Sequence, residues 1–266
     1  MNPLVEMFSY SFILRALVVG IAISLCAALV GVTVVLRRNS MIGDGLSHVA
    51  FGAFAIATVL GVTPIWFALP VVILASFAVL SLSRSKKTSG DAAIALLSAS
   101  SLAIGIMAIS VSGGVNIDLN SYLFGSILSV GWSDVCLSVG LAVIVVGLYI
   151  FAHNRIFAIT FDEDFARSIG IKVRLYDTIF AVICSVVVVL GMRLLGALLI
   201  SSLIIFPTLI ATQLAKSFKR VVLYAAVVSV INFVIGLILS YLISTPTGAT
   251  VVVVNLAVLM VAKLLI

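Results

Sequence analysis

Residues 12–36 read FILRALVVGIAISLCAALVGVTVVL and are followed directly by Arg37 and Arg38. Apart from Arg15 the run is almost wholly apolar, and as a helix with a rise of about 1.5 Å per residue it exceeds the roughly 30 Å of a hydrocarbon core. A backbone in lipid must pair its own N–H and C=O groups, which an α-helix does. The stretch therefore predicts a transmembrane helix that ends at two cations.

Similar runs recur from one end of the chain to the other. The 266 residues are 64% hydrophobic and 9% charged, with a mean hydropathy of +1.40. A soluble domain carries roughly a quarter charged residues, so most of the outer surface here must face lipid. The alternating pattern of a membrane barrel is absent. The sequence predicts an all-α polytopic bundle with nine spans, at about 12–36, 45–61, 64–83, 91–110, 132–153, 174–191, 195–215, 221–243 and 247–266. The mixed stretch 113–131 is expected to be a loop or a re-entrant half-helix.

The positive charges fall on one side of this arrangement. With the N-terminus outside, every one of the 15 Lys and Arg residues except Arg15 and Arg193 lies toward the inside. This asymmetry is what the positive-inside rule describes, and it predicts an N-out, C-in topology. The loops are short, so residues 1–266 are expected to form a single transmembrane domain in the lipid bilayer. The net charge of +6 is then explained without nucleic acid.

Neither residues 1–11 nor the three cysteines indicate a feature other than a membrane bundle. Residues 1–11 lack the basic start and the cleavage site of a secretory signal peptide, so the first helix is expected to remain. Cys26, Cys136 and Cys184 are widely spaced in apolar runs. They show no metal or redox spacing, and we expect buried thiols that pack as small hydrophobes.

The segment 155–174, between the fifth and sixth spans, carries both signs of charge. Asp162, Glu163 and Asp164 are three consecutive acids and suit the first turn of a helix, where the dipole favours negative charge. Gly170 suits the end of that helix. A solvated amphipathic helix is one interpretation, and a docking element for a cytoplasmic partner is the other.

Asp44 and His48 form the most informative pair in the sequence. They are four residues apart at the start of the second span, so on a helix they share one face. A carboxylate and an imidazole together can coordinate a divalent transition metal, and ionisable groups inside a membrane are expected to be functional. The structural alternative is that Asp44 stabilises a helix N-terminus and His48 bonds to it. Simple hydropathy places Asp44 near the cytoplasmic surface.

Two other acids are candidates for the outer mouth of a metal pathway. Asp118 and Asp134 fall toward the outside in the predicted topology. Solvated loop carboxylates are the alternative for both.

Three stretches taken together resemble one family, the metal-ion ABC importer permeases (ABC-3). Residues 36–48 (LRRNSMIGDGLSH) are similar to the family's Gly-Asp-Ala-Leu-Ser-His signature. Residues 161–170 (FDEDFARSIG) are similar to its coupling loop, and residues 193–207 (RLLGALLISSLIIFP) to its Gly-x-Leu-Leu span. The matches follow one another in order along the chain, which departs from the signature only at Gly45.

The resemblance implies an ATP-driven importer of divalent transition metal ions in a bacterial plasma membrane. Asp44 and His48 would bind the ion, with zinc favoured over manganese or iron because one ligand is a histidine. The resemblance also implies that Asp162, Glu163, Asp164, Ala166, Arg167 and Gly170 form the surface that couples the permease to a cytoplasmic ATP-binding subunit.

The expected partners follow from the same resemblance. Two copies of the permease would pair around a central pathway, and an extracellular metal-binding protein would deliver the ion. No permanently bound cofactor is expected besides the transported metal, and ATP hydrolysis would belong to the separate subunit. In related vitamin B12 and siderophore permeases the helix breaks at the region that matches residues 37–48, which would place Asp44 and His48 nearer the midplane.

Three other functions fit the sequence less well. A siderophore or cobalamin permease would share the fold but leave the Asp44–His48 pair without a purpose. A gradient-driven secondary transporter would favour more acids inside the spans. An intramembrane enzyme would need a catalytic motif such as His-Glu-x-x-His, which does not occur. The sequence also contains no Walker motif, as expected if ATP is hydrolysed on a separate subunit.

Overall fold

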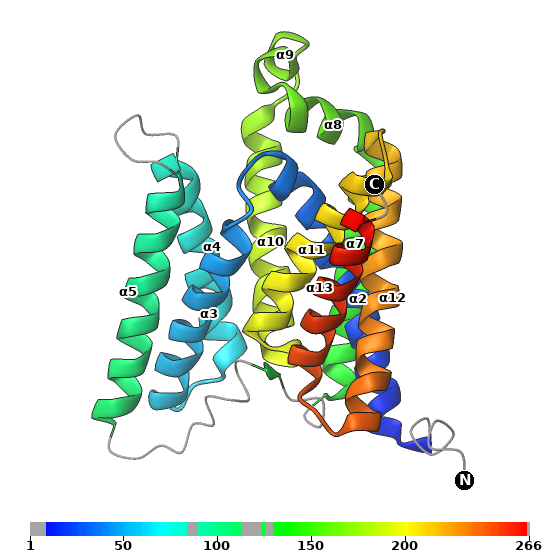
Figure 1. Cartoon of the computed structure of the whole chain (residues 1–266). Helices are drawn as coiled ribbons and strands as arrows, with labels where there is room; N and C mark the ends of the chain where they lie inside the picture. Colours follow the sequence, from blue (N-terminus) through cyan, green and yellow to red (C-terminus); the bar gives the residue numbers. More distant parts are fainter. Residues whose placement is uncertain (1–8, 84–89, 113–123, 126–129, 265–266) are drawn as a thin grey trace.

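The computed structural model describes residues 9–83, 90–112, 124–125 and 130–264, and in these ranges the chain is a bundle of helices (Figure 1). Nine of the described helices are long and apolar enough to cross a membrane. They are α2 (Ser11–Leu36), α3 (Ile42–Val59), α4 (Pro64–Ser83), α5 (Gly90–Val111), α7 (Trp132–Phe151), α10 (Val173–Leu195), α11 (Ala197–Leu214), α12 (Phe218–Ile243) and α13 (Thr247–Leu264). The prediction of an all-α bundle with nine spans is confirmed.

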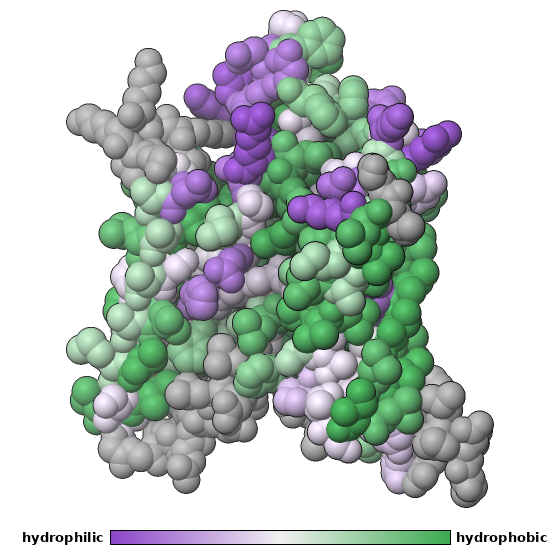
Figure 2. Space-filling view, in the orientation of Figure 1, coloured by the Kyte–Doolittle hydropathy of each residue, from purple (hydrophilic) through white to green (hydrophobic). Residues whose placement is uncertain are grey.

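Successive long helices run in opposite directions, and the start of α2 and the end of α13 lie at opposite ends of the bundle (Figure 1). The end that holds the C-terminus also carries the α2–α3 turn and two short helices, α8 (His153–Phe161) and α9 (Glu163–Ser168). Figure 2 shows that hydrophilic residues gather at this end above a largely apolar flank. This separation supports the N-out, C-in orientation, which stays a prediction.

Helix α2 lies at the centre of the larger group of helices. It packs against α7, α10, α11 and α12, and more than half of its residues are buried. The close approach of α11 depends on Gly31, because a Cβ there would lie 2.0 Å from the carbonyl oxygen of Ile204. Helices α3, α4 and α5 form a second group, which contacts the first through α10 and α11 (Figure 1).

The outer helices expose large apolar side chains. Only about a fifth of α4, α5 and α13 is buried. Trp66 on α4, Met107 on α5 and Val253 on α13 are all more than half exposed. Such a surface is stable when hydrocarbon replaces water around it.

Polar side chains inside the bundle are paired across helices. The Asn232 amide on α12 donates to the Asn255 side-chain oxygen on α13 at 2.8 Å, and Asn255 lies 3.4 Å from the Ser202 hydroxyl on α11. Ser229 donates to the Ser24 carbonyl at 2.9 Å, which ties α12 to α2. Each such bond contributes on the order of 1 kcal/mol in a membrane protein.

Some details differ from the sequence predictions. The second span begins at Ile42, three residues earlier than expected, so Asp44 lies inside its first turn. Residues 153–161 form a helix of their own instead of part of a loop. Gly196, with φ of 92°, separates α10 from α11, so the motif of residues 193–207 spans a junction between two helices.

The prediction for the cysteines is correct for two of the three. Cys26 and Cys184 are buried and free, but Cys136 is exposed on α7. The prediction for Cys136 is wrong because an apolar neighbourhood in a membrane protein is as typical of the lipid-facing surface as of the core. The expected loop or re-entrant half-helix at residues 113–131 lies mostly outside the described residues.

Candidate functional site

The turn between α2 and α3 leads directly into the Asp44–His48 pair. The backbone N–H of Arg37 donates to the Thr33 carbonyl at 3.1 Å and closes α2. Arg38 follows in the left-handed region with φ of 59°, which reverses the chain. The chain then enters α3, and its first turn carries Asp44.

Asp44 and His48 lie on the same face of α3, as their spacing predicts. The His48 Nε2 atom is 3.6 Å from the Asp44 Oδ2 atom. The side chains are 31% and 44% exposed, respectively, in the single chain. An imidazole nitrogen and a carboxylate oxygen held this close suit zinc or manganese as ligands.

The first turn of α3 lies at mid-height in the bundle. A Cβ at Gly43 would lie 2.7 Å from Ile204 Cδ1, and the Ser47 hydroxyl is 3.4 Å from that of Ser201. Both partners lie well inside α11 (Ala197–Leu214). In Figure 1, α3 accordingly begins below the upper ends of α2 and α10. The pair is therefore deeper than simple hydropathy indicates.

Asp91 is a third acid at the same place, and sequence reasoning missed it. Asp44, His48 and Asp91 line one open pocket of about 280 Å³ between α3 and α5. The described residues contain no group of three His, Cys, Asp or Glu side chains close enough together to hold a metal. One feature of the sequence could have indicated Asp91: it lies in the first turn of its transmembrane helix, as Asp44 does in α3.

Gly45, where the chain departs from the family signature, lies in the α3–α5 contact. A Cβ at this position would be 2.4 Å from Ile94 Cγ2 and 3.2 Å from Ser98 Oγ. The glycine thus allows α5, which carries Asp91, to lie close to α3.

The charged segment between the fifth and sixth spans forms α8 and α9. Asp162 caps α9, since its Oδ1 atom accepts from the Phe165 N–H at 2.9 Å. Glu163 and Asp164 occupy the first turn of α9, and both are within ion-pair distance of Arg167. The predicted helix start is confirmed.

The end of α9 also matches the prediction. The helix ends at Ser168, and Gly170 has φ of 84°. Ala166 is fully buried against the bundle, while Asp164 and Arg167 are exposed. Ala166 therefore anchors α9 to the bundle, while the charged side chains of α9 point away from it.

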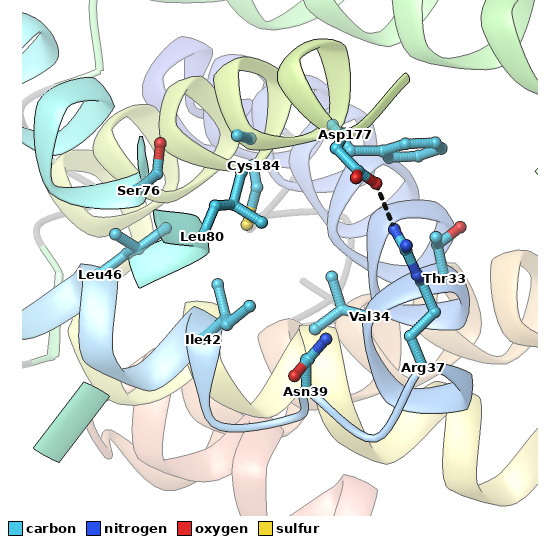
Figure 3. Close-up of a pocket in the computed structure, with 12 residues that line it drawn as sticks. Thr33, Val34, Arg37, Asn39, Ile42, Leu46, Ser76, Leu80, Asp177 and Cys184 are labelled. Atoms are coloured by element: carbon cyan, nitrogen blue, oxygen red, sulfur yellow. Dashed lines mark hydrogen bonds and ion pairs between the residues drawn. The ribbon is translucent and has the colours of Figure 1, made fainter. Parts of the chain in front are cut away.

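Arg37, at the end of α2, joins this segment to α2 and α10, a contact that sequence reasoning did not find. Its Nη1 atom is 2.7 Å from the Asp177 Oδ1 atom on α10, and its Nη2 atom is 3.3 Å from the Glu163 Oε2 atom on α9. Figure 3 shows the bond to Asp177 beside a small cavity that Arg37 and Asp177 line. The residues are too far apart in sequence for a local pattern to indicate the contact.

Arg155 is a second cation that joins the segment to α10. Its Nη1 atom donates to the Tyr176 hydroxyl at 3.0 Å. This hydrogen bond raises the pKa of Arg155, which is protonated at physiological pH in any case, so it remains a fixed positive charge.

Of the two acids predicted at the outer mouth, the structure describes only Asp134. Asp134 is 3% exposed, and its Oδ1 atom is 2.9 Å from the Arg193 Nη1 atom. Its Oδ2 atom accepts from the Gly131 N–H at 2.9 Å, so this carboxylate ties α7 to α10 and is not a solvated loop acid. Asp118 lies outside the described residues.

These features define a class of protein. The chain is a polytopic membrane bundle with an acid–imidazole pair at mid-height and a charged helical segment at one end. Ionisable groups at such a depth are typical of proteins that carry a substrate or ion across the membrane.

The comparison with known families makes the assignment specific. The model of the ABC 3 transport family matches residues 9–266, and the chain belongs to this family. It is therefore a multi-pass protein of the bacterial plasma membrane and the permease component of an ABC transporter.

Individual relatives cover nearly the whole chain. It is 30% identical to the high-affinity zinc uptake system membrane protein ZnuB of Haemophilus influenzae, over 92% of this chain and 94% of that protein. It is also 30% identical to the manganese import system permease protein ScaB of Streptococcus gordonii, over 91% of this chain and 87% of that protein.

Solved structures show the same fold. PsaBC from Streptococcus pneumoniae, in complex with Fab, superposes with a TM-score of 0.86 at 26% identity, covering 98% of this chain and 94% of that one. An inward-facing putative metal-chelate type ABC transporter gives a TM-score of 0.72 at 15% identity, covering 100% of this chain and 90% of that one.

Proposed function

We propose that the chain is the permease subunit of an ATP-driven importer of divalent transition metal ions and that Asp44 and His48 bind the ion during its passage. The proposal rests on one observation: the His48 imidazole nitrogen and an Asp44 carboxylate oxygen lie 3.6 Å apart at mid-height in the bundle. Ionisable groups at this depth are costly, and in membrane proteins they mark substrate or ion pathways. The direction of transport rests on the family resemblance.

The exposure of the pair supports a homodimer. Two or three ligands are fewer than the four that zinc usually takes, and the pocket opens outward from the single chain. Figure 2 shows an isolated hydrophilic patch at mid-height of the apolar flank, over α3. A second copy placed against this face would exclude lipid and bring its own Asp44 and His48 to the ion.

Zinc is our preferred cargo, and manganese or iron is the alternative. Imidazole suits zinc, while carboxylates suit manganese, so the presence of His48 favours zinc. The relatives named above include one zinc and one manganese system. A siderophore or cobalamin would make no use of the pair.

The charged end of the bundle is the proposed docking site for the cytoplasmic ATP-binding subunit. Asp162, Glu163, Asp164, Ala166, Arg167 and Gly170 form its centre, with the outward charges of α9 available for ion pairs. ATP hydrolysis would occur on that partner, and an extracellular metal-binding protein would bring the ion to the opposite end.

The first experiment measures total cellular zinc, manganese and iron in a strain that lacks the permease. The strain is complemented with wild type, Asp44→Ala or His48→Ala at equal membrane levels, and His153→Ala serves as the control because this second histidine lies at the end of the bundle against Phe218. We expect wild type and the control to restore one metal and the two other variants to fail. If wild type restores no metal, the cargo assignment is wrong, and uptake of a metal chelate or vitamin is tested instead.

A further inference from the structure

We infer that Arg37 is a positioning residue that transmits movement of α9 to the metal-binding turn of α3. The inference rests on the proposed function and adds a connection between its two separate sites. The metal-facing residues lie at mid-height, whereas α9 lies at the end of the bundle (Figure 1). Arg37 contacts α9 directly and begins the turn that leads into α3.

The two ion pairs of Arg37 differ in strength. Asp177 is 5% exposed, and removing one partner of a buried ion pair is strongly destabilising, so the short contact with Asp177 holds Arg37 in place. Glu163 is 36% exposed, and its contact with Arg37 at 3.3 Å is longer than the 2.7 Å contact with Asp177. A partly exposed pair with this longer contact is weaker than the buried one and can be exchanged. Asp177 therefore anchors Arg37 to α10, and Glu163 is the releasable contact.

Glu163 has a second cation available on its own helix. Its Oε1 atom contacts Arg167, which also lies 3.5 Å from an oxygen of Asp164. A shift of α9 can thus move Glu163 away from Arg37 while Glu163 keeps a partner. The exchange costs little because no charge is left alone.

The α2–α3 turn is well placed to pass such a shift to the metal-binding residues. Arg37 is followed by Arg38 in the left-handed region and then by the first turn of α3 with Asp44. Helices α3, α4 and α5 form a group of their own, with Asp44, His48 and Asp91 all on it. A change of angle at this turn therefore moves all three candidate ligands together.

A cavity of about 60 Å³ lies where this movement needs space. It is lined by Arg37 and Asp177 on one side and by Ile42 and Leu46 of α3 on another (Figure 3). Close-packed interiors resist displacement, so an unfilled volume beside the first turn of α3 lets its apolar side chains shift without a clash.

The test uses the permease with its ATP-binding subunit and delivery protein in proteoliposomes, and it measures zinc, manganese or iron taken up per ATP hydrolysed. The variants are Glu163→Gln, Arg37→Lys and the double variant. Lysine keeps the charge of Arg37 but lacks the fork that reaches two carboxylates at once. Arg38→Lys is the matched control, since Arg38 is adjacent and exposed and forms no ion pair among the described residues.

Each single variant is expected to lower the metal moved per ATP about fivefold, and the double variant no further, because both remove the same contact. In Arg37→Lys and in the Arg38→Lys control, ATP hydrolysis and binding of the ATP-binding subunit should remain at wild-type levels, and the control should also keep the wild-type ratio of metal to ATP. An unchanged ratio in both single variants, additive losses in the double variant, or loss of subunit binding in Arg37→Lys would each overturn the link. If wild type itself moves no metal, the proposed function fails and the inference fails with it.

Discussion

At the scale of single residues, the surroundings of each carboxylate decide what it can bind. Asp134 is buried, and its oxygens already accept from Arg193 and from a backbone N–H. Asp44 is 44% exposed and faces His48 at 3.6 Å across an open pocket. The first carboxylate is committed to holding two helices together, and the second retains oxygen lone pairs for an ion.

Asp91 provides a prediction at this scale. It lines the pocket with Asp44 and His48. Asp91→Asn should therefore lower metal uptake at limiting metal concentration by about tenfold, which is the lower end of the loss typically seen when a group that supports a metal site is removed. Asp91→Glu keeps the carboxylate and should retain most of the uptake. The measurement is initial uptake of the restored metal across a range of concentrations. Wild-type uptake by Asp91→Asn would exclude Asp91 from the pathway.

At the scale of helices, the packing of α3 on α5 keeps Asp91 beside Asp44. The contact is made where both helices carry small residues. A Cβ at Gly52 would lie 2.4 Å from the carbonyl oxygen of Ser101, and a Cβ at Gly105 would lie 2.8 Å from the Cα of Gly52. Small residues at such crossings let two helix backbones approach closely.

Gly52→Ala is therefore expected to destabilise the protein. The new methyl group would meet backbone, which cannot move aside as a side chain can, and overpacking of this kind costs about 1–3 kcal/mol. Thermal unfolding of the purified protein in detergent measures the effect. Gly140→Ala on α7 is the matched control, since nothing lies within 4 Å of its Cβ position. The control should be neutral or stabilising by up to about 1 kcal/mol through helix propensity, and equal melting of both variants would contradict the account.

At the scale of the whole molecule, the two ends of the bundle differ in charge. The end with α8, α9 and the α2–α3 turn is hydrophilic (Figure 2) and carries Arg37, Glu163, Asp164 and Arg167. The opposite end has the start of α2 and the short connection between α12 and α13. The positive-inside rule assigns the charged end to the cytoplasm.

Cysteine labelling tests this orientation. In a chain whose three native cysteines are replaced, Thr245→Cys and Ser217→Cys place one thiol in an exposed position at each end of the bundle. A membrane-impermeant maleimide should label Thr245→Cys in intact cells and Ser217→Cys only after the membrane is opened. The reverse pattern would show that the N-terminus is inside.

The sequence by itself determined the number of spans, their helical state and the common face of Asp44 and His48. Lipid leaves a long apolar run no alternative to a helix, and residues four apart on a helix are neighbours whatever surrounds it. For the same local reason, the sequence predicted the start of α9 at Asp162 and its end before Gly170.

Only the tertiary structure decided which residues the helices bring together. The exposure of Cys136 was hidden because lipid-facing and buried positions are equally apolar. The place of Asp91 beside Asp44 depends on how α5 packs on α3, and the two acids of Arg37 come from α9 and α10. Such contacts depend on how the surfaces of two helices fit together, and the residue pattern within one helix does not predict this fit.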